Sequence, residues 1–138
     1  MITAFYAALL GLLNLILTCY VILGRWKYRV SLGDGGHKEL NRRIRAHGNF
    51  IETIPMTLLL LFFTEYTLKS PTLTQSSQLW IHGPALTLLL GRILHFWGLR
   101  QKRSVNRYRQ IGMGITLMIN LGLVLWLLHI LTPQLINL

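Results

Sequence analysis

The amino-acid sequence predicts an all-α protein, a bundle of four transmembrane helices that forms one domain over residues 1–138. Apolar residues make up 52% of the chain and charged residues only 13%, about half the share in an average soluble domain. The net charge is nevertheless +10, because 14 Lys and Arg stand against four Asp and Glu. Long uncharged runs separate these charges, so we expect the basic residues to gather in short loops between membrane spans.

The first span is predicted over residues 2–23, a run of 22 residues without a charge. As a helix it would extend about 33 Å, enough to cross the hydrocarbon core of a bilayer. No basic segment precedes it and no small-residue cleavage site follows it, so we expect a retained span, not a removed signal peptide. The only cysteine, Cys19, lies inside this run, which excludes an intrachain disulfide.

Three further spans follow, over residues 45–66, 79–98 and 111–131. Glu52 and Glu65 interrupt the second span, Arg92 is the one charge in the third, and the fourth has none. Every backbone polar group in lipid needs a partner within the protein, and runs of this length meet that need as helices. Polar turn residues at 33–36 and 70–78 separate the first three spans.

The distribution of the basic residues predicts the orientation of the bundle. The first loop and its helix ends hold Arg25, Lys27, Arg29, Lys38, Arg42, Arg43 and Arg45, and the third loop holds Arg100, Lys102, Arg103, Arg107 and Arg109. The second loop has only Lys69. The positive-inside rule therefore places the first and third loops in the cytoplasm and both termini on the outer side.

The sequence argues against nucleic-acid binding and against a metal site. A nucleic-acid-binding protein could be equally basic, but it would spread its cations over a water-facing surface instead of short loops between apolar runs. A structural or catalytic metal site needs a cluster of Cys, His or carboxylate ligands, and the sequence has none with suitable spacing. We therefore expect no nucleic-acid partner and no metal.

Two charged residues lie deep in the predicted membrane spans. Glu52 is seven residues from the cytoplasmic end of the second span, and Arg92 is about equally far from that of the third. Both would lie at a depth of about 10 Å, where an unpaired charge costs roughly 2.5–3.5 kcal/mol. Because the two spans are antiparallel neighbours, we predict an ion pair between Glu52 and Arg92. The pair would either lock the bundle or take part in a site.

A polar stripe leads from this pair toward the cytoplasm. On the second helix it comprises Arg42, Arg45, Asn49 and Glu52, and on the third Arg92 and His95. The spacing places each set on one side of its helix. Guanidinium groups bind carboxylates and a glutamate can bind an ammonium, so the stripe suits an anionic ligand that also carries an ammonium group. Alternatively, Arg42 and Arg45 extend toward lipid phosphates.

Residues 45–55, RAHGNFIETIP, resemble the R-A-x-x-N-x-x-E-x-x-P signature of the MAPEG family, the membrane-associated proteins in eicosanoid and glutathione metabolism. The resemblance extends to Gly91-Arg92-Ile93-Leu94-His95, to Arg109-x-x-Gly112 and, as in small bacterial members, to residues 25–36. It covers most of the chain and implies an integral protein of the bacterial inner membrane.

The resemblance also implies a homotrimer that binds glutathione as a co-substrate between neighbouring subunits, near the cytoplasmic face. The residues implicated in binding are Arg45, Asn49, Glu52 and His95, with Arg25 or Arg29 reaching the ligand from the first helix. Arg109 matches the arginine that stabilises the glutathione thiolate, and Arg107 is the alternative. A cation beside a thiol favours the thiolate, which is the nucleophile.

Two departures from the family pattern bear on catalysis. Leu99 and Met113 stand where eicosanoid-synthesising members have tyrosines. The predicted function is a glutathione-dependent transferase or peroxidase that acts on hydrophobic electrophiles dissolved in the bilayer. The alternative is a lipid- or glutathione-binding membrane protein without catalysis. A small proton-coupled multidrug exporter is a third hypothesis, but a Glu52 paired with an arginine would stay ionised and could not exchange protons easily.

Overall fold

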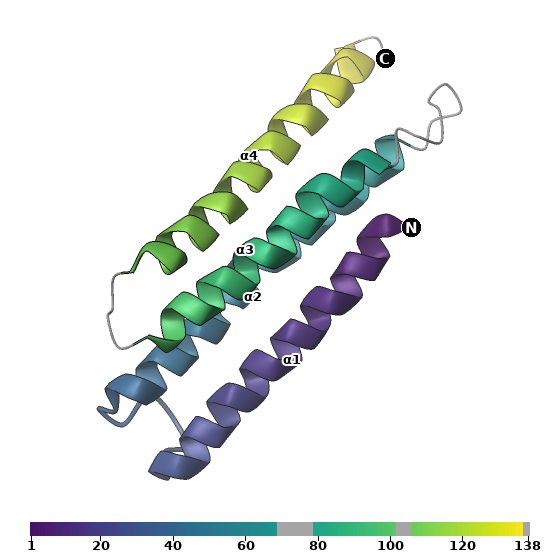
Figure 1. Cartoon of the computed structure of the whole chain (residues 1–138). Coiled ribbons are helices and arrows are strands. Elements are labelled where there is room, and N and C mark those ends of the chain that lie inside the picture. The colour runs from purple at the N-terminus through teal and green to yellow at the C-terminus, as the bar shows by residue number, and fades with distance from the viewer. Residues whose placement is uncertain (69–78, 102–105, 137–138) are drawn as a thin grey trace.

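The computed structural model describes residues 1–68, 79–101 and 106–136. Its helices are α1 (Ile2–Tyr28), α2 (Lys38–Thr67), α3 (His82–Arg100) and α4 (Arg107–Ile136). Consecutive helices run antiparallel, so the first turn of α1 and the last turn of α4 point to the same end of the molecule (Figure 1). The described residues contain no strand, which confirms the all-α prediction. The predicted turn at 70–78 and the basic residues Lys69, Lys102 and Arg103 lie outside the described residues.

Three of the described helices, α1, α2 and α4, are long and apolar enough to cross a membrane. The helix α3 has only 19 residues, about 28 Å, and includes Arg92 and two histidines. It forms where the third span was expected, but it starts at His82, and residues 79–81 make a short 3₁₀ turn instead. By length and composition alone, α3 is therefore not among the described helices that could cross a membrane.

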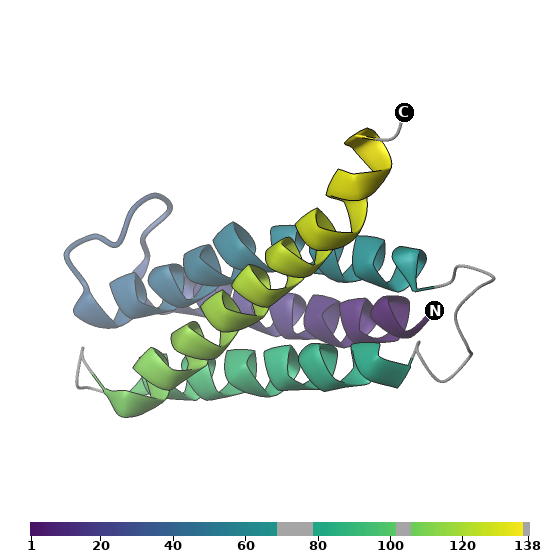
Figure 2. The same ribbon diagram turned by 90° about the horizontal axis from the view of Figure 1, so that it is seen from above.

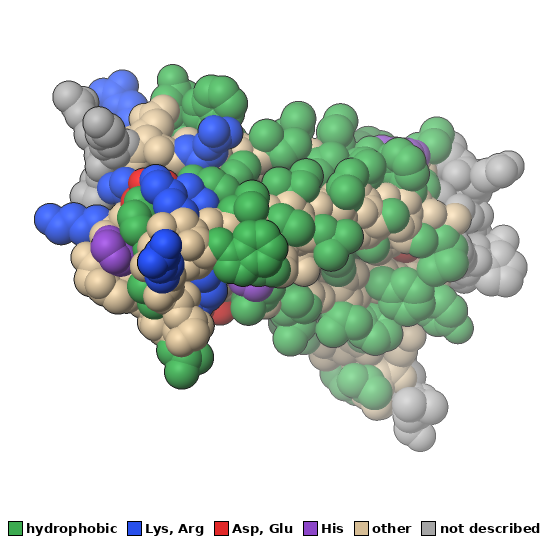
Figure 3. All heavy atoms as spheres, turned by 90° about the horizontal axis from the view of Figure 1, so that it is seen from below, with side chains coloured by type: hydrophobic (Ala, Val, Ile, Leu, Met, Phe, Trp, Pro, Cys, Tyr) green, Lys and Arg blue, Asp and Glu red, His purple; other side chains and the backbone are tan. Residues whose placement is uncertain are grey.

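The bundle core is made of buried apolar side chains from all four helices. Prominent members are Leu10, Leu17, Phe50, Ile54, Leu61, Ala85, Leu88 and Leu123. Much of the remaining surface is also apolar, as expected for helices surrounded by lipid. Lys and Arg side chains gather at the end where α1 finishes and α2 begins, whereas apolar side chains cover most of the rest of the visible face (Figure 3).

Glycines allow α3 and α4 to approach each other closely near their connected ends. A Cβ atom on Gly112 would lie 2.5 Å from the carbonyl oxygen of Gly91, and one on Gly98 would lie 2.6 Å from the backbone nitrogen of Arg109. Small residues at such positions are typical of helix contacts in membranes, where packing drives association. Toward its C-terminal end α4 tilts away from the other helices (Figure 2).

The loop between α1 and α2 is held by its own hydrogen bonds. The helix α1 ends at Tyr28 because Arg29 takes the left-handed conformation, with φ of 53°. In the turn that follows, the Asp34 carboxylate accepts hydrogen bonds from the side-chain amide of Asn41 and from the backbone N–H of Gly36. These bonds, that from Asn41 foremost, lower the pKa of Asp34 below its ordinary value. The predicted turn at 33–36 is confirmed.

Glu65 caps the N-terminus of α1 from the neighbouring helix α2. Its carboxylate is 1% exposed and accepts the backbone N–H groups of Ile2 at 3.0 Å and Thr3 at 2.7 Å. The first N–H groups of a helix have no partner within it, and the positive end of the helix dipole favours a negative charge there. Glu65 therefore has a structural role at the end of the bundle opposite the basic residues.

Replacing Glu65 with leucine should destabilise the folded protein by about 2–4 kcal/mol, because two charge-assisted hydrogen bonds are lost in a buried place. Denaturant-induced unfolding of the purified protein in detergent would measure the change. The matched control is Tyr66→Leu at the adjacent, exposed position. Equal stability of the two variants would show that the cap contributes nothing.

Candidate functional site

The signature residues of α2 lie on two sides of that helix, not all in the bundle. Arg45 and Glu52 are exposed, whereas Asn49 is half-buried and faces α3 and α4. Ala46, Phe50 and Ile54 occupy the buried side and pack into the core. Of the stripe predicted from the spacing, Asn49 therefore faces α3 and α4, whereas Arg45 and Glu52 are exposed.

The centre of the polar cluster is Arg92, which is 2% exposed. Its guanidinium donates to the side-chain oxygen of Asn49 at 2.7 Å and to the hydroxyl of Thr116 at 3.4 Å. It also lies over the ring of Phe50, 5.6 Å from the ring centroid, in a cation–π contact. A buried cation from α3 thus connects α2 to α4.

The predicted ion pair between Glu52 and Arg92 is not formed. Among the described residues the ion pairs join Glu39 to Lys27 and to Arg43. The reason is helical rotation: side chains three residues apart point about 60° apart, and the packing of α2 turns Asn49 toward α3 and Glu52 outward. Asn49 therefore meets Arg92, and the exposed Glu52 carboxylate does not reach the guanidinium.

His95 is a buried contact between α3 and α4. Its Nδ1 lies 3.0 Å from the backbone carbonyl oxygen of Arg109, and its Nε2 has no partner among the described residues. Because Nδ1 faces an acceptor, the hydrogen bond needs its proton on Nδ1. The backbone of Arg109 is thereby held at the first turn of α4 while its side chain is exposed.

Asn106 fixes the same turn from the other side. Its side-chain oxygen accepts the backbone N–H of Arg109 at 2.9 Å, and its amide donates to the carbonyl of Gly98 at 2.6 Å. This is the capping position just before α4, which favours asparagine. Sequence reasoning missed both Asn106 and Thr116, although an asparagine directly before a helical run is a recognisable signal.

The arginines of the first loop differ from one another in their surroundings. Arg25 donates to the backbone carbonyls of Ser31 at 2.9 Å and Gly33 at 3.1 Å, so it braces the loop. Arg29 is exposed at the loop entrance. Arg43, which the sequence marked only as a loop cation, donates to Glu39 at 2.6 Å and lies over the ring of Tyr20. The absence of a side chain on Gly24 leaves room for it.

In one chain, the predicted residues other than Arg25 therefore separate into two groups. Asn49, Arg92 and His95 meet between α2, α3 and α4, where Met113 adds a sulfur contact 3.7 Å from the Asn49 amide. A second, exposed group comprises Arg45, Glu52, Arg29 and Arg109. Within the described ranges, no three His, Cys, Asp or Glu side chains are grouped so that they could hold a metal ion.

The membrane-length helices and the polar cluster around the buried Arg92 define a class: a small helical membrane protein with a polar site inside its bundle. The model of the MAPEG family matches residues 3–129, and the chain belongs to this family. It is 36% identical over 117 residues to "Inner membrane protein YecN" of Escherichia coli K12, covering 84% of this chain and 82% of the relative. The protein of the same name from E. coli O6:H1 gives the same values.

These comparisons confirm the family resemblance seen in residues 45–55. They also confirm the prediction of an integral inner-membrane protein, because the relative is one and the helices are able to span a membrane.

Proposed function

We propose that this protein is a glutathione-dependent transferase or peroxidase that acts on hydrophobic electrophiles in the bilayer. The observation that carries the proposal is the arrangement on α2: an exposed cation, Arg45, and an exposed carboxylate, Glu52, lie on either side of the anchored amide of Asn49. Glutathione has carboxylates and an ammonium group that this combination could bind. Family membership supports the same ligand.

Each group has a role that its chemistry fits. Glu52 would bind the ammonium group, and Arg45 a carboxylate. The side-chain oxygen of Asn49 accepts a hydrogen bond from Arg92, which leaves the amide nitrogen of Asn49 to donate. Its contact with the Met113 sulfur is weak, so this nitrogen can donate to the ligand instead. Arg109 would stabilise the thiolate, whose sulfur forms a bond to the electrophilic carbon while the leaving group departs with the electron pair.

The position of Glu52 also supports an assembly. A carboxylate facing lipid about 10 Å inside the membrane is costly, and its neighbours on the same exposed side, Met56, Leu59 and Phe63, are apolar. A second copy covering this side of α2 would shield the charge and supply groups to the site. We therefore propose a homotrimer of four-span subunits, with basic loops in the cytoplasm, termini outside and glutathione between subunits.

A second candidate is glutathione or lipid binding without catalysis. Leu99 is buried at 8% exposure and Met113 contacts Asn49, so apolar side chains fill the places where eicosanoid-synthesising members have tyrosine hydroxyls. Turnover of chlorodinitrobenzene with and without glutathione separates the two candidates. Glutathione-dependent conjugation supports the enzyme, and tight binding without turnover supports the second candidate.

Glutathione binding to the purified protein, measured by calorimetry, tests the site itself. Glu52→Gln should weaken binding by about 10- to 100-fold, because a charge-assisted hydrogen bond to the ammonium group is lost. The control Glu39→Gln removes a charge of the same sign from the first turn of α2, where Glu39 pairs with Lys27 and Arg43 and not with the proposed ligand. Unchanged affinity in Glu52→Gln, or an equal loss in both variants, would contradict the assignment.

A further inference from the structure

A groove beside the last turn of α1 combines apolar and cationic side chains. Its volume is about 730 Å³, within the roughly 300–1,000 Å³ of small-molecule sites. The lining comprises Ile22, Arg25, Trp26, Arg29, Val30 and Ser31. The first four of these follow i, i+3, i+4 and i+7 spacing, so they share one side of α1. The groove lies at the basic end of the bundle (Figure 3), and the proposed function uses none of its side chains.

The chain that follows α1 forms the second wall of this groove. Arg29 takes the left-handed conformation, so the backbone turns back, and the N–H of Val30 donates to the carbonyl of Arg25 at 3.1 Å. Val30 packs directly against Gly35, where a Cβ atom would lie 2.6 Å from its side chain. The Arg25 guanidinium donates to two further carbonyls of the loop. The contacts of the loop itself therefore hold the groove in shape.

The positive charge of the groove is not neutralised by the loop. Arg29 is exposed, and its guanidinium has no partner among the described residues. Arg25 donates to neutral carbonyls and to no carboxylate within the described ranges. The carboxylates nearby are engaged elsewhere, because Asp34 accepts two hydrogen bonds from amide groups and Glu39 pairs with two other cations. Two guanidiniums in this state suit a phosphate group.

Ile22 and Trp26 distinguish between a soluble phosphate and a lipid. Both side chains are exposed, one just before and one just after the end of the predicted span at residue 23. Tryptophan is enriched at this level of membrane proteins, where lipid headgroups meet acyl chains. A free phosphate would leave the two apolar surfaces uncovered, whereas the glycerol and acyl chains of a phospholipid would cover them.

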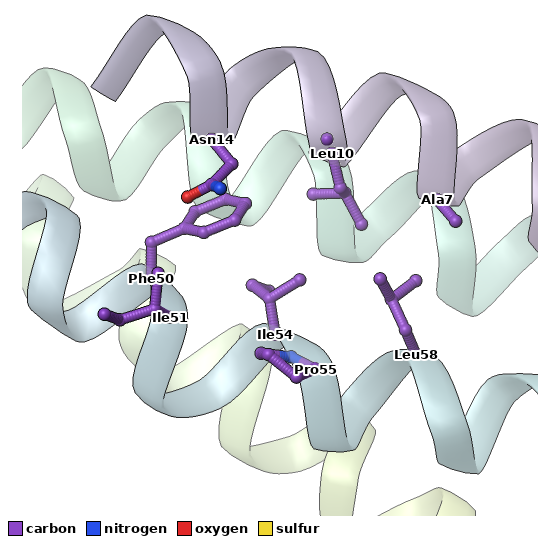
Figure 4. A pocket seen from close by; sticks show the side chains of 9 residues that line it. Ala7, Leu10, Asn14, Phe50, Ile51, Ile54, Pro55 and Leu58 are labelled. Atoms are coloured by element: carbon purple, nitrogen blue, oxygen red, sulfur yellow. The ribbon is translucent and has the colours of Figure 1, made fainter. Parts of the chain in front are cut away.

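The pocket between α1 and α2, nearer the middle of α1, provides a contrast. Its sides are apolar, with Leu10 of α1 facing Ile54 of α2, and no charged side chain lines it (Figure 4). Such a space does not indicate the charge of an occupant. The groove at the end of α1 does, because two cations line it.

We propose that this groove binds an anionic phospholipid of the leaflet at the basic end of the bundle. Arg25 and Arg29 bind its phosphate, and Ile22 and Trp26 contact the glycerol and the beginning of the acyl chains. A zwitterionic lipid fits less well, because its headgroup ammonium would meet two guanidiniums. A cation near the membrane surface contributes roughly a fivefold preference for anionic lipid.

Native mass spectrometry of the full chain in detergent, without glutathione, tests the proposal. The probes are phosphatidylglycerol and phosphatidylcholine with the same acyl chains, and glycerol 3-phosphate, which has the phosphate but no acyl chains. The chain should bind phosphatidylglycerol at least about fivefold more tightly than phosphatidylcholine. Equal binding of the two lipids, or equally tight binding of glycerol 3-phosphate, would overturn the proposal.

Variants of Arg29 locate the effect. Arg29→Asn should reduce the preference for phosphatidylglycerol about fivefold, because one of the two cations is lost. Asparagine is suitable because it readily adopts the left-handed conformation at the end of a helix. Arg29→Lys keeps the charge and should retain most of the preference.

The matched control is Arg107→Asn, which removes the same charge from another exposed arginine outside the groove. It should keep the preference for phosphatidylglycerol. Equal losses in Arg29→Asn and Arg107→Asn would show a general attraction to the basic end and overturn the site. An unchanged preference in Arg29→Asn would overturn it as well.

Discussion

Arg109→Ala should abolish the ultraviolet absorbance of thiolate in the complex with glutathione and lower conjugation of chlorodinitrobenzene at least about tenfold at pH 7. A thiol with an ordinary pKa near 8.5 is only a few per cent ionised at neutral pH, and a neighbouring cation raises that fraction. The backbone of Arg109 is held in place, because its N–H donates to the side-chain oxygen of Asn106 and its carbonyl oxygen lies 3.0 Å from His95 Nδ1. The exposed side chain extends from this anchored turn.

Arg107→Ala is the matched control, because Arg107 is also exposed and precedes Arg109 by two residues at the start of α4. Two residues along a helix turn a side chain by about 200°, so the two guanidiniums leave the helix on nearly opposite sides. We expect Arg107→Ala to keep the thiolate absorbance. Retained absorbance in Arg109→Ala would contradict the role of Arg109, and loss in Arg107→Ala alone would transfer that role to Arg107.

Gly112→Leu should destabilise the bundle by about 3 kcal/mol or more and lower the midpoint of thermal unfolding by about 10 °C. A side chain at this position meets the Gly91 carbonyl oxygen at 2.5 Å and the backbone nitrogen of His95 at 2.8 Å. Backbone atoms cannot yield as the end of a flexible side chain can, so α3 and α4 would have to separate. Separation would also break the contact between His95 and Arg109.

The control for this prediction lies two residues further along the same helix. A Cβ atom on Gly114 meets nothing within 4 Å, so Gly114→Leu should leave stability within about 1 kcal/mol of the original. Unfolding of both variants in the same detergent, followed by circular dichroism, makes the comparison. Similar stability of the two leucine variants would show that the close approach of α3 and α4 does not hold the bundle together.

The helices themselves could be predicted from the sequence, but their ends could not. The apolar runs gave spans at 2–23 and 45–66, whereas α1 continues to Tyr28 and α2 begins at Lys38. Hydropathy marks the part of a helix that contacts lipid, while backbone hydrogen bonds continue into the aqueous region until a capping signal ends them. Here that signal is the left-handed conformation of Arg29.

The depth of the candidate residues along their helices could be predicted from the sequence, but their contacts could not. The spacing of Asn49 and Glu52 placed both near Arg92 in depth, but depth along a helix says nothing about its rotation. Rotation is set by packing of the apolar side chains, here Phe50 and Ile54 in the core, and it turns Asn49 rather than Glu52 toward α3. Arg25 was likewise predicted by position, and only the folded loop shows that Ser31 and Gly33 engage it.

The sequence by itself determined that this chain is a helical membrane protein of the MAPEG family, because long apolar runs and the signature at 45–55 are properties of the chain alone. The tertiary structure decided which polar groups meet. It joined Arg92 to Asn49 and Thr116, placed Glu65 at the start of α1 and left Glu52 exposed. The physical reason is that a buried polar group takes whichever partner the packing of apolar side chains brings within reach.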